Sequence, residues 1–153
     1  MTDVTEGAPA PDFNLETPDG PVTLADFAGR TLVLYFYPKD DTSGCTKEAQ
    51  EFTALAADFA AAGVSVIGVS KDSLAAHKKF TAKYALGIPL ASDPTGEVVD
   101  RYGSWVEKSL YGRKYMGIDR STFLIQDGTI ARIWRKVKVA NHAQQVLETA
   151  RPG

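Results

Sequence analysis

The sequence has very little cysteine and histidine: its 153 residues contain one cysteine, Cys45, and two histidines. A single thiol excludes an internal disulfide, a CxxC redox pair and a cysteine-rich zinc site, because each of these needs at least two cysteines. The sequence shows no cluster of metal-ligating residues, and we expect neither a metal nor a cofactor. Any thiol chemistry therefore starts from one sulfur atom.

Long apolar segments are also missing. The longest uninterrupted apolar run, Leu32 to Tyr37, has six residues, whereas a helix needs about 20 to span a bilayer. The first residues, Met1 to Glu6, are acidic and contain no apolar stretch of the kind found in secretory signal peptides. The sequence therefore predicts a cytoplasmic protein that does not bind membranes.

Charge is nearly balanced, with a formal net charge of −2, but it is unevenly distributed. Residues 1–100 carry 7 Lys and Arg against 15 Asp and Glu, and residues 101–153 carry 10 against 4. Part of the excess of basic residues in residues 101–153 comes from a basic cluster made of Arg132, Arg135, Lys136 and Lys138. Charges that alternate along a strand are typical of a solvated face, and the sequence shows no aromatic-basic interleaving of the RNA-binding type. We therefore do not expect nucleic acid as a partner.

What the sequence does contain is sufficient for one folded domain. It is 44% hydrophobic and 24% charged, which allows a full apolar core, and its length is typical of a single domain. We find no repeat, low-complexity tract or linker. Residues 1–153 are therefore predicted to form one domain.

Apolar patterning predicts an α/β fold. The β-rich run Thr31–Tyr37, which ends before Pro38, is typical of a strand buried on both faces of a sheet. An apolar helical face from Cys45 onward predicts a helix of about 17 residues that ends near Gly63. The next predicted elements are a strand at Val64–Val69, a helix at Ser73–Tyr84 capped by Asp72 or Ser73, and a short strand at Ile88–Ala91.

Turn signals predict two hairpins. The first is N-terminal and turns at Thr17–Gly20. The second pairs Ser121–Ile125 with Thr129–Trp134 across a Gln-Asp-Gly turn. Asn141 is the expected cap of a last helix, which ends at Ala150. The order βαβα followed by ββα implies a mixed central sheet flanked by helices, with an N-terminal β-hairpin extension, which is the plan of the thioredoxin-like fold.

Cys45 lies where the loop after the predicted central strand enters a helix. The unpaired N–H groups and the positive dipole end of a helix stabilise a thiolate, so we expect Cys45 to be reactive. A lone cysteine is otherwise most often a small buried core residue. Here Gly44 allows close backbone approach, and Thr42 and Ser43 place hydroxyls within one turn of the sulfur. The charged segment Lys39-Asp40-Asp41 is expected to keep the loop at the surface.

The segment around the cysteine carries a family resemblance. Residues 37–48 read YPKDDTSGCTKE, which resembles the Pro-x3-Thr-x2-Cys active-site loop of the peroxiredoxins. The likeness is to the Q-type, or bacterioferritin-comigratory, branch and covers essentially the whole chain. Other segments that carry it are Ser92–Pro94, Tyr102–Trp105, Tyr115–Ile118 and Arg120–Phe123.

The resemblance implies a thiol-dependent peroxidase that reduces hydrogen peroxide and organic hydroperoxides. Cys45 would attack a peroxide oxygen as a thiolate and become a sulfenic acid. Thr42 and Arg120 would be catalytic beside it, because the reaction needs donors aimed at both peroxide oxygens. The backbone N–H groups of Gly44 and Cys45 would complete the pocket.

Two further residues are expected to support the site. Pro38 would shield the thiolate from solvent, and Glu48 is hypothesised to hold Arg120 by a charge-assisted hydrogen bond. Taken singly, Thr42 could only cap the helix, Glu48 could only favour its N-terminus, and Arg120 could be an exposed strand-edge charge. Their joint arrangement around one cysteine favours the functional interpretation. Trp105 is expected to pack beside the site.

Other functions are compatible with a lone reactive cysteine. A cysteine hydrolase would need His77 or His142 as its base, but both positions are typical of exposed residues and no oxyanion motif accompanies them. A peroxide sensor or redox relay would oxidise at Cys45 and turn over poorly. A non-enzymatic binding module would have an unreactive Cys45.

The chain departs from the Q-type pattern at the resolving cysteine. Many relatives have it five residues after the peroxidatic one, where this chain has Gln50, and others have it in the next helix, where this chain has Thr81. The resemblance then implies a one-cysteine cycle with an external thiol, such as thioredoxin, glutaredoxin or a low-molecular-weight thiol. Ser43 stands where relatives often have proline, which loosens the turn slightly. We expect a monomer, because the sequence shows no uncovered apolar helix face.

Overall fold

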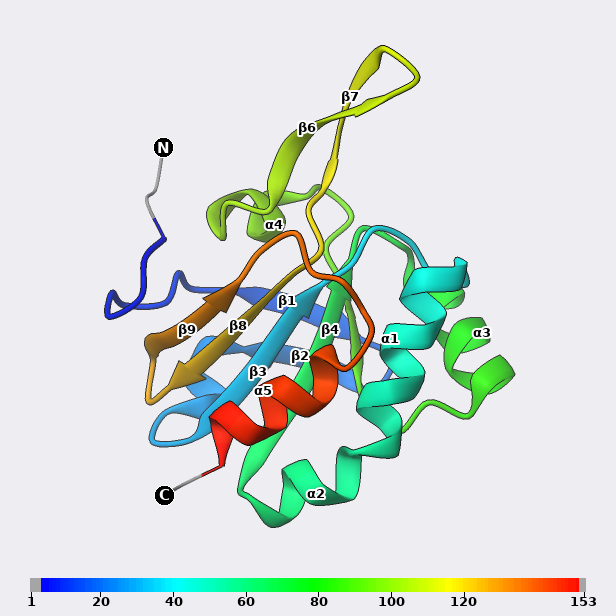
Figure 1. The fold of residues 1–153 in the computed structure, drawn as a ribbon. Coiled ribbons are helices and arrows are strands. Elements are labelled where there is room, and N and C mark those ends of the chain that lie inside the picture. The colour runs from blue at the N-terminus through cyan, green and yellow to red at the C-terminus, as the bar shows by residue number, and fades with distance from the viewer. Residues whose placement is uncertain (1–3, 152–153) are drawn as a thin grey trace.

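A seven-stranded mixed β-sheet forms the centre of the protein, and a separate two-stranded sheet lies beside it (Figure 1). The computed structural model describes residues 4–151. The strand order in the large sheet is β2-β1-β5-β4-β3-β8-β9. Its strands are β1 (Asn14–Thr17), β2 (Gly20–Thr23), β3 (Thr31–Phe36), β4 (Val64–Ser70), β5 (Leu90–Ser92), β8 (Ser121–Gln126) and β9 (Thr129–Trp134).

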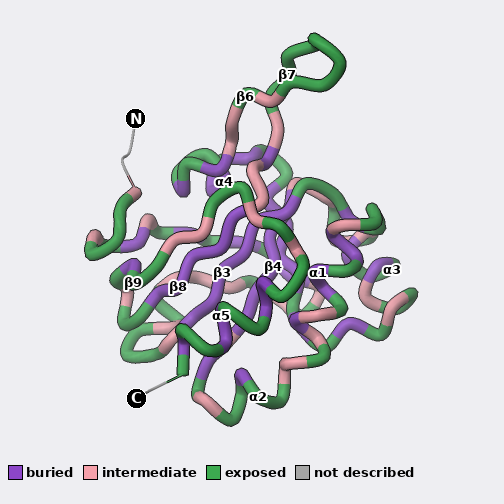
Figure 2. Tube along the Cα trace, viewed as in Figure 1, coloured by how far each residue is buried: buried purple, intermediate pink, exposed green. Residues whose placement is uncertain are grey.

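The central strand is β3, which pairs parallel with β4 and antiparallel with β8. Every residue from Leu32 to Phe36 is buried, which confirms the predicted strand with both faces covered. Successive side chains of a strand point to opposite faces, so Val33 and Tyr35 pack in one core and Leu34 packs in the other. Figure 2 shows β3 and β8 as purple, buried tubes for most of their length.

Helices cover both faces of the sheet, as the sequence predicts. One core contains apolar side chains of α1, α2, α3 and α5, and the other contains those of α4 and of the N-terminal segment. The helices are α1 (Ser43–Ala54), α2 (Ala56–Ala61), α3 (Leu74–Tyr84), α4 (Glu97–Arg101) and α5 (His142–Ala150), with a short 3-10 helix, η1, at Leu24–Phe27. This arrangement confirms the expected mixed α/β architecture.

Several local predictions are confirmed in detail. The predicted N-terminal turn joins β1 to β2 in an antiparallel hairpin. The turn between β8 and β9 contains Asp127 and Gly128, with φ angles of 47° and 76°. The side chain of Ser73 accepts a hydrogen bond from the N–H of Ala76 at 3.2 Å and thereby caps α3.

Some element boundaries differ from the prediction. The helix that carries the cysteine begins at Ser43, and it is divided at Leu55, whose φ of −100° and ψ of 4° leave the α-helical region. The strand expected at Ile88–Ala91 is β5, which begins two residues later and ends one residue later. Asn141 precedes α5, but it has a φ of 62° and its side chain makes no capping hydrogen bond.

One hairpin was not predicted from the sequence; it is formed by β6 (Trp105–Leu110) and β7 (Arg113–Ile118). It makes up the two-stranded sheet and projects away from the body of the protein (Figure 1). Its apolar and polar residues do not alternate, because both faces of its outer part are exposed. Its turn contains Tyr111 and Gly112 instead of the Asn-Gly or Asp-Gly pair that marks a hairpin in a sequence.

A glycine in β4 makes room for an aromatic ring beneath the helix that carries Cys45. A Cβ atom added at Gly68 would lie 2.7 Å from Cζ and from Oη of Tyr35. The Tyr35 ring in turn stacks on Phe52 of α1, with ring centroids 4.6 Å apart. Burial, with smaller effects from nearby carboxylates, holds the pKa of Tyr35 well above its usual range. The ring therefore fills the space between the sheet and α1 as a neutral phenol.

Candidate functional site

Cys45 lies in the first turn of α1 and is 2% exposed. The loop from Tyr37 to Thr42 connects β3 to this helix, as predicted. The first intrahelical hydrogen bond runs from the N–H of Thr46 to the carbonyl of Thr42 at 2.8 Å. The N–H groups of residues 43–45 therefore have no acceptor within the helix, and together with the helix dipole they favour negative charge at this position.

Arg120 follows β7 by two residues and contacts Cys45 and Glu48 together. Its Nη2 donates to Sγ of Cys45 at 3.2 Å, and its Nη1 donates to Oε1 of Glu48 at 2.7 Å. A Cβ atom added at Gly44 would lie 3.2 Å from Nη2 of Arg120, so glycine leaves room for the guanidinium group. The structure thus brings four of the predicted site residues together, including the hypothesised pair of Glu48 and Arg120.

The ion pair between Glu48 and Arg120 is largely buried, with side chains 1% and 17% exposed. Burial raises the pKa of Glu48 to about 7, although the charge and hydrogen bond of Arg120 lower it. Burial alone would lower the pKa of Arg120, but the charges of Glu48 and Cys45 outweigh it and raise that pKa above its usual value. Oε2 of Glu48 has no hydrogen-bond partner among the described residues. Arg120 therefore stays cationic beside the sulfur, while Glu48 can exchange a proton near neutral pH.

Thr42 and Pro38 are both exposed, in the loop that leads from β3 to α1. Oγ1 of Thr42 donates to the carbonyl of Lys39 at 2.8 Å. The side chain makes no hydrogen bond that caps α1, so the capping role considered from the sequence is absent. Pro38 stands directly in the loop that leaves β3, as predicted.

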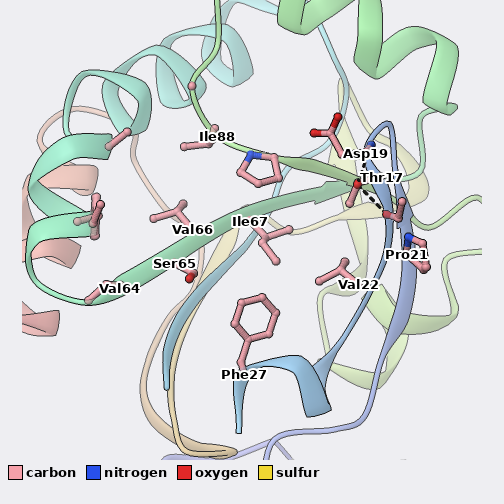
Figure 3. A pocket seen from close by; sticks show the side chains of 16 residues that line it. Thr17, Asp19, Pro21, Val22, Phe27, Val64, Ser65, Val66, Ile67 and Ile88 are labelled. Atoms are coloured by element: carbon pink, nitrogen blue, oxygen red, sulfur yellow. Dashed lines mark hydrogen bonds between the residues drawn. The ribbon is translucent and has the colours of Figure 1, made fainter. Parts of the chain in front are cut away.

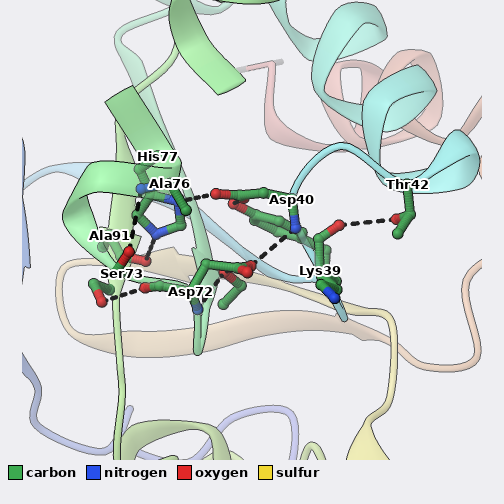
Figure 4. A network of polar contacts seen from close by, with 11 residues as sticks. Lys39, Asp40, Thr42, Asp72, Ser73, Ala76, His77 and Ala91 are labelled. Atoms are coloured by element: carbon green, nitrogen blue, oxygen red, sulfur yellow. Dashed lines mark hydrogen bonds and ion pairs between the residues drawn. The ribbon is translucent and has the colours of Figure 1, made fainter. Parts of the chain in front are cut away.

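A buried polar network fixes this loop against α3 (Figure 4). His77 of α3 donates from Nε2 to the carbonyl of Ala91 at 2.9 Å, and its Nδ1 lies 2.7 Å from Oδ2 of Asp40. Asp40 also accepts the hydroxyl of Tyr37 at 2.6 Å, and its N–H donates to Asp72 at 2.9 Å. Asp40 is buried, so the expectation that it lies at the surface is wrong. Its carboxylate can be buried because these partners satisfy it.

Both histidines are buried, which corrects their expected exposure. His77 is 0% and His142 is 3% exposed, because each finds a polar partner from a distant part of the sequence. Nε2 of His142 lies 2.7 Å from Oγ1 of Thr122, and burial, with a smaller effect from Arg120, lowers the pKa of His142 to about 4. Neither ring is hydrogen-bonded to Cys45 in the described structure, so the cysteine hydrolase interpretation lacks its base.

The remaining residues singled out from the sequence lie outside the contacts of the cysteine. Trp105 packs on the core opposite α1, and Nζ of Lys71 lies 4.4 Å from its ring centroid. Gln50 is exposed on α1, and Thr81 is half-buried on α3. Among residues 4–151, no three His, Cys, Asp or Glu side chains gather into a group that could hold a metal ion.

Comparison with known proteins identifies the family. Residues 7–133 match the AhpC/TSA family. The chain is 48% identical over 143 residues to a putative peroxiredoxin bcp of Coxiella burnetii, a match that covers 92% of this chain and 95% of that protein. The chain belongs to the AhpC/TSA family of peroxiredoxins. This peroxiredoxin is also 44% identical over 151 residues to the peroxiredoxin Bcp of Xanthomonas campestris, covering 96% and 94% of the two chains.

A solved structure supports the same relationship. The bacterioferritin comigratory protein of Xanthomonas campestris superposes with a TM-score of 0.88 at 41% identity, and the match covers 97% of each chain. The structure of that protein is of a trapped intermediate/ligand complex and bears on its alkyl peroxide reduction activity. The Q-type resemblance and the thioredoxin-like fold are thereby confirmed. The protein is a thiol-dependent peroxidase, and with one cysteine it is of the one-cysteine type.

The basic cluster of the peroxiredoxin is partly used within the fold. Arg135 donates to the carbonyls of Tyr102 and Gly103 at 3.1 and 3.2 Å. The guanidinium of Arg132 lies 5.1 Å from the ring centroid of Trp134. These contacts give two of the four cations a structural role.

None of the helices within residues 4–151 has the length and apolarity needed to cross a membrane.

An apolar cavity of about 470 Å³ lies away from the cysteine (Figure 3). It is bounded by the β1–β2 hairpin, by α2 and by the first half of β4. Its apolar lining includes Phe27, Val66, Ile67 and Ile88. The beginning of β4 is at the opposite end of the sheet from the loop that carries Cys45, because β3 and β4 run parallel. None of the predicted site residues of the peroxiredoxin lines this cavity.

Glu48→Gln is expected to change how the stability of the peroxiredoxin depends on pH. The pKa of Glu48 is about 7 in the folded protein against an ordinary value of 4.5, so between these values the folded state keeps a proton that the unfolded state has lost. The contribution of Glu48 to the free energy of unfolding therefore becomes less favourable as the pH rises from 4.5 to 7, and is constant above. Between about pH 5 and pH 8 the variant should gain about 2.5 kcal/mol relative to wild type.

Urea unfolding of both proteins at each pH measures this difference. Glu16→Gln is the matched control, because it removes an exposed carboxylate of β1 that makes none of these contacts. Its difference from wild type should not change over the same pH range. Parallel pH curves for Glu48→Gln and wild type would mean that Glu48 stays ionised beside Arg120 throughout.

Proposed function

We propose that Cys45 is the residue that reduces the peroxide, acting as a thiolate at the N-terminus of α1. The observation that carries this proposal is the 3.2 Å hydrogen bond from Nη2 of Arg120 to Sγ of Cys45, which sets a cation against the sulfur. The N–H groups of residues 43–45 add the partial positive charge of the helix N-terminus. Both effects favour the thiolate, which is the nucleophilic form of cysteine.

The reaction transfers one oxygen atom to the sulfur. Sγ of Cys45 attacks one oxygen of the hydroperoxide, and the S–O bond forms as the O–O bond breaks. The departing oxygen takes the electron pair of the O–O bond, gains a proton and leaves as water or an alcohol, while Cys45 becomes a sulfenic acid. Negative charge thus moves from the sulfur to the departing oxygen. The planar guanidinium of Arg120 can donate to both, which makes it suited to this step.

The other predicted residues hold the peroxide and exclude water. Thr42 would turn its hydroxyl from the loop carbonyl toward the substrate, accept a hydrogen bond from the peroxide O–H and donate one to the thiolate. The N–H groups of Gly44 and Cys45 would donate to the peroxide oxygens. Pro38 would limit access of water to the thiolate. Glu48 is a positioning residue, because it acts by fixing the guanidinium group with its 2.7 Å hydrogen bond.

The sulfenic acid must then be reduced by a thiol from another molecule. The chain has Gln50 and Thr81 where relatives have a resolving cysteine, so no second thiol is available in it. An external thiol condenses with the sulfenic acid, which releases water and leaves a mixed disulfide on Cys45. A second thiol displaces Cys45 and carries away the oxidised reductant. Thioredoxin, glutaredoxin and low-molecular-weight thiols can all supply this chemistry.

We take hydrogen peroxide and organic hydroperoxides as the substrates, and the alkyl peroxide reduction activity named for the Xanthomonas campestris relative supports the second class. Residues 1–153 would act as a single domain and as a monomer. A cytoplasmic location fits this cycle, because that compartment keeps thiols reduced.

Stopped-flow oxidation of the reduced protein by hydrogen peroxide across a range of pH tests the proposal. The product is then identified by intact mass with a sulfenic-acid trap. We expect oxidation far faster than that of a free thiol, and one trapped adduct per chain. Oxidation as slow as that of a free cysteine would contradict the proposal.

A peroxide sensor or redox relay is the competing function, and the single cysteine is the observation that favours it. It predicts equally fast oxidation, negligible turnover with thioredoxin, glutaredoxin or glutathione, and a persistent mixed disulfide with one specific protein in cell extract. Steady peroxide consumption with any of these three reductants would exclude it.

A further inference from the structure

The β6–β7 hairpin collects the exposed apolar side chains of the protein. Within residues 4–151, all the large hydrophobic side chains that are exposed belong to it: Leu110, Tyr111, Tyr115 and Met116. Single exposed apolar residues are ordinary on a protein surface, but a group of them on one projecting element is typical of an interaction site. Figure 1 shows the hairpin standing clear of both core layers.

The turn of the hairpin holds a bulky residue in a strained backbone conformation. Tyr111 and Gly112 have φ angles of 50° and 77°, which is the pattern of a two-residue hairpin turn that normally contains Asn-Gly. A tyrosine at positive φ is unfavourable. Tyr111 is also 96% exposed, so packing within the chain does not compensate. The exposed ring of Tyr111 can therefore contact a molecule that binds to the hairpin.

The strand register divides the hairpin into two different faces. Lys108 is paired with Tyr115, and Leu110 is paired with Arg113. Alternate residues of a strand share a face, so these four side chains lie on one side of the hairpin. We call this set, Lys108, Leu110, Arg113 and Tyr115, the docking face.

The two faces also differ in charge. On the opposite face, Nζ of Lys114 lies 3.6 Å from Oε1 of Glu107, so the charges there balance. Glu107 is the only carboxylate in residues 105–118, which leaves Lys108 and Arg113 without an acidic partner from the hairpin. The docking face is therefore apolar and cationic, and it suits a partner surface that is apolar and acidic.

The base of the hairpin is fixed next to Arg120. The N–H of Asp119 donates to the carbonyl of Ser104 at 2.7 Å. The buried hydroxyls of Ser104 and Ser121 lie 2.6 Å apart. These bonds tie both ends of the hairpin to the start of β8, so the docking face has a defined position relative to the site.

The chain itself joins the docking face to the site. Strand β7 ends at Ile118, and Arg120, which donates to Sγ of Cys45, follows two residues later. Within the docking face, Lys108 and Tyr115 are nearer the base of the hairpin, and Leu110 and Arg113 are next to its exposed turn.

We propose that the docking face binds the protein that reduces oxidised Cys45, a dithiol protein whose reactive thiol is surrounded by an apolar and acidic surface. This inference rests on the proposed function, in which the reductant comes from outside the chain. A protein thiol must be oriented toward the sulfur by surface contacts, whereas a small thiol needs none. A second copy of this chain suits the docking face less well, because a symmetric dimer would place two cationic faces against each other.

Surface variants of the hairpin test the proposal. The docking-face variants are Arg113→Glu and the double variant Leu110→Ser with Tyr115→Ser, and their matched controls on the opposite face are Lys114→Glu and Met116→Ser. Peroxide consumption is measured with thioredoxin and with glutaredoxin, each with its regenerating system, and with dithiothreitol. With the protein reductant, we expect the docking-face variants to lose about tenfold or more in kcat/KM, through a higher KM. Turnover with dithiothreitol and the rate of Cys45 oxidation should be unchanged.

Several results would overturn the proposal. They are an unchanged kcat/KM with the protein reductant, an equal loss in the opposite-face controls, and turnover of the wild type with small thiols only. A dimer that the docking-face variants dissociate would assign the face to a second copy of the chain. Slow oxidation of wild-type Cys45 would instead overturn the proposed function itself, so the two failures are distinguishable.

Discussion

Cys45→Ser is expected to abolish peroxide consumption in the presence of either thioredoxin or dithiothreitol. Serine preserves the shape of the side chain, but its hydroxyl does not ionise near neutral pH and cannot supply the nucleophile that forms the S–O bond. Removing a nucleophile leaves only what binding contributes, so the rate should fall by more than about 1,000-fold. The measurement is the loss of hydrogen peroxide with time at equal protein concentration.

Gln50→Ser is the matched control for this substitution. It also introduces a serine into α1, but at an exposed position that makes no contact with the sulfur. This variant should keep the wild-type rate. Unchanged peroxide consumption by Cys45→Ser would show that the activity does not reside in the single thiol of the chain.

Arg120→Ala is expected to slow the oxidation of Cys45 by about 100-fold or more in stopped-flow experiments. The substitution removes the only cation that the structure hydrogen-bonds to the sulfur within residues 4–151. The thiolate loses a stabilising charge, and the departing oxygen loses a donor. The same change leaves Glu48 buried without its ion-pair partner, which should lower the free energy of unfolding by about 3 kcal/mol when Glu48 is ionised.

Two further variants separate the catalytic effect from the loss of stability. Adding Glu48→Gln to Arg120→Ala removes the unpaired carboxylate, so stability should recover while oxidation stays slow. Arg120→Lys keeps the positive charge, but a single ammonium group lacks the fork that reaches both Sγ and Oε1, so its rate should be intermediate. Oxidation of Arg120→Ala at the wild-type rate would remove Arg120 from the catalytic residues.

The elements that were correctly predicted are those whose sequence pattern is set by burial. β3 has apolar residues on both faces, and its pattern follows directly from its central place between β4 and β8. The β6–β7 hairpin was missed for the opposite reason. Most of its residues contact solvent on both faces of the hairpin, so apolar and polar residues do not alternate along its strands. The glycine after Tyr111 was the one available signal for its turn.

In the site, too, features that depend on neighbouring residues could be predicted from the sequence, and features that depend on distant contacts could not. Cys45 at a helix start follows from the local sequence, whereas its contact with Arg120, 75 residues away, entered only through the family resemblance. That contact depends on the pairing of β3 with β8, which local patterns do not specify. The burial of His77 was missed because its partner, Asp40, is 37 residues away. A charged residue near a turn looks exposed until such a partner is known.

The close packing of Gly68 under Tyr35 restricts how this sequence can evolve. A methyl group at position 68 would displace the Tyr35 ring, and through its stack on Phe52 it would press on the helix that carries Cys45. Positions 35 and 68 are therefore expected to covary. Gly68 can be replaced only after position 35 has lost its ring, so an exchange at two apolar positions in neighbouring strands must occur in a fixed order. The order of substitutions at residues 35 and 68 therefore limits the positions that the Cys45 thiol can adopt, although neither residue takes part in its chemistry.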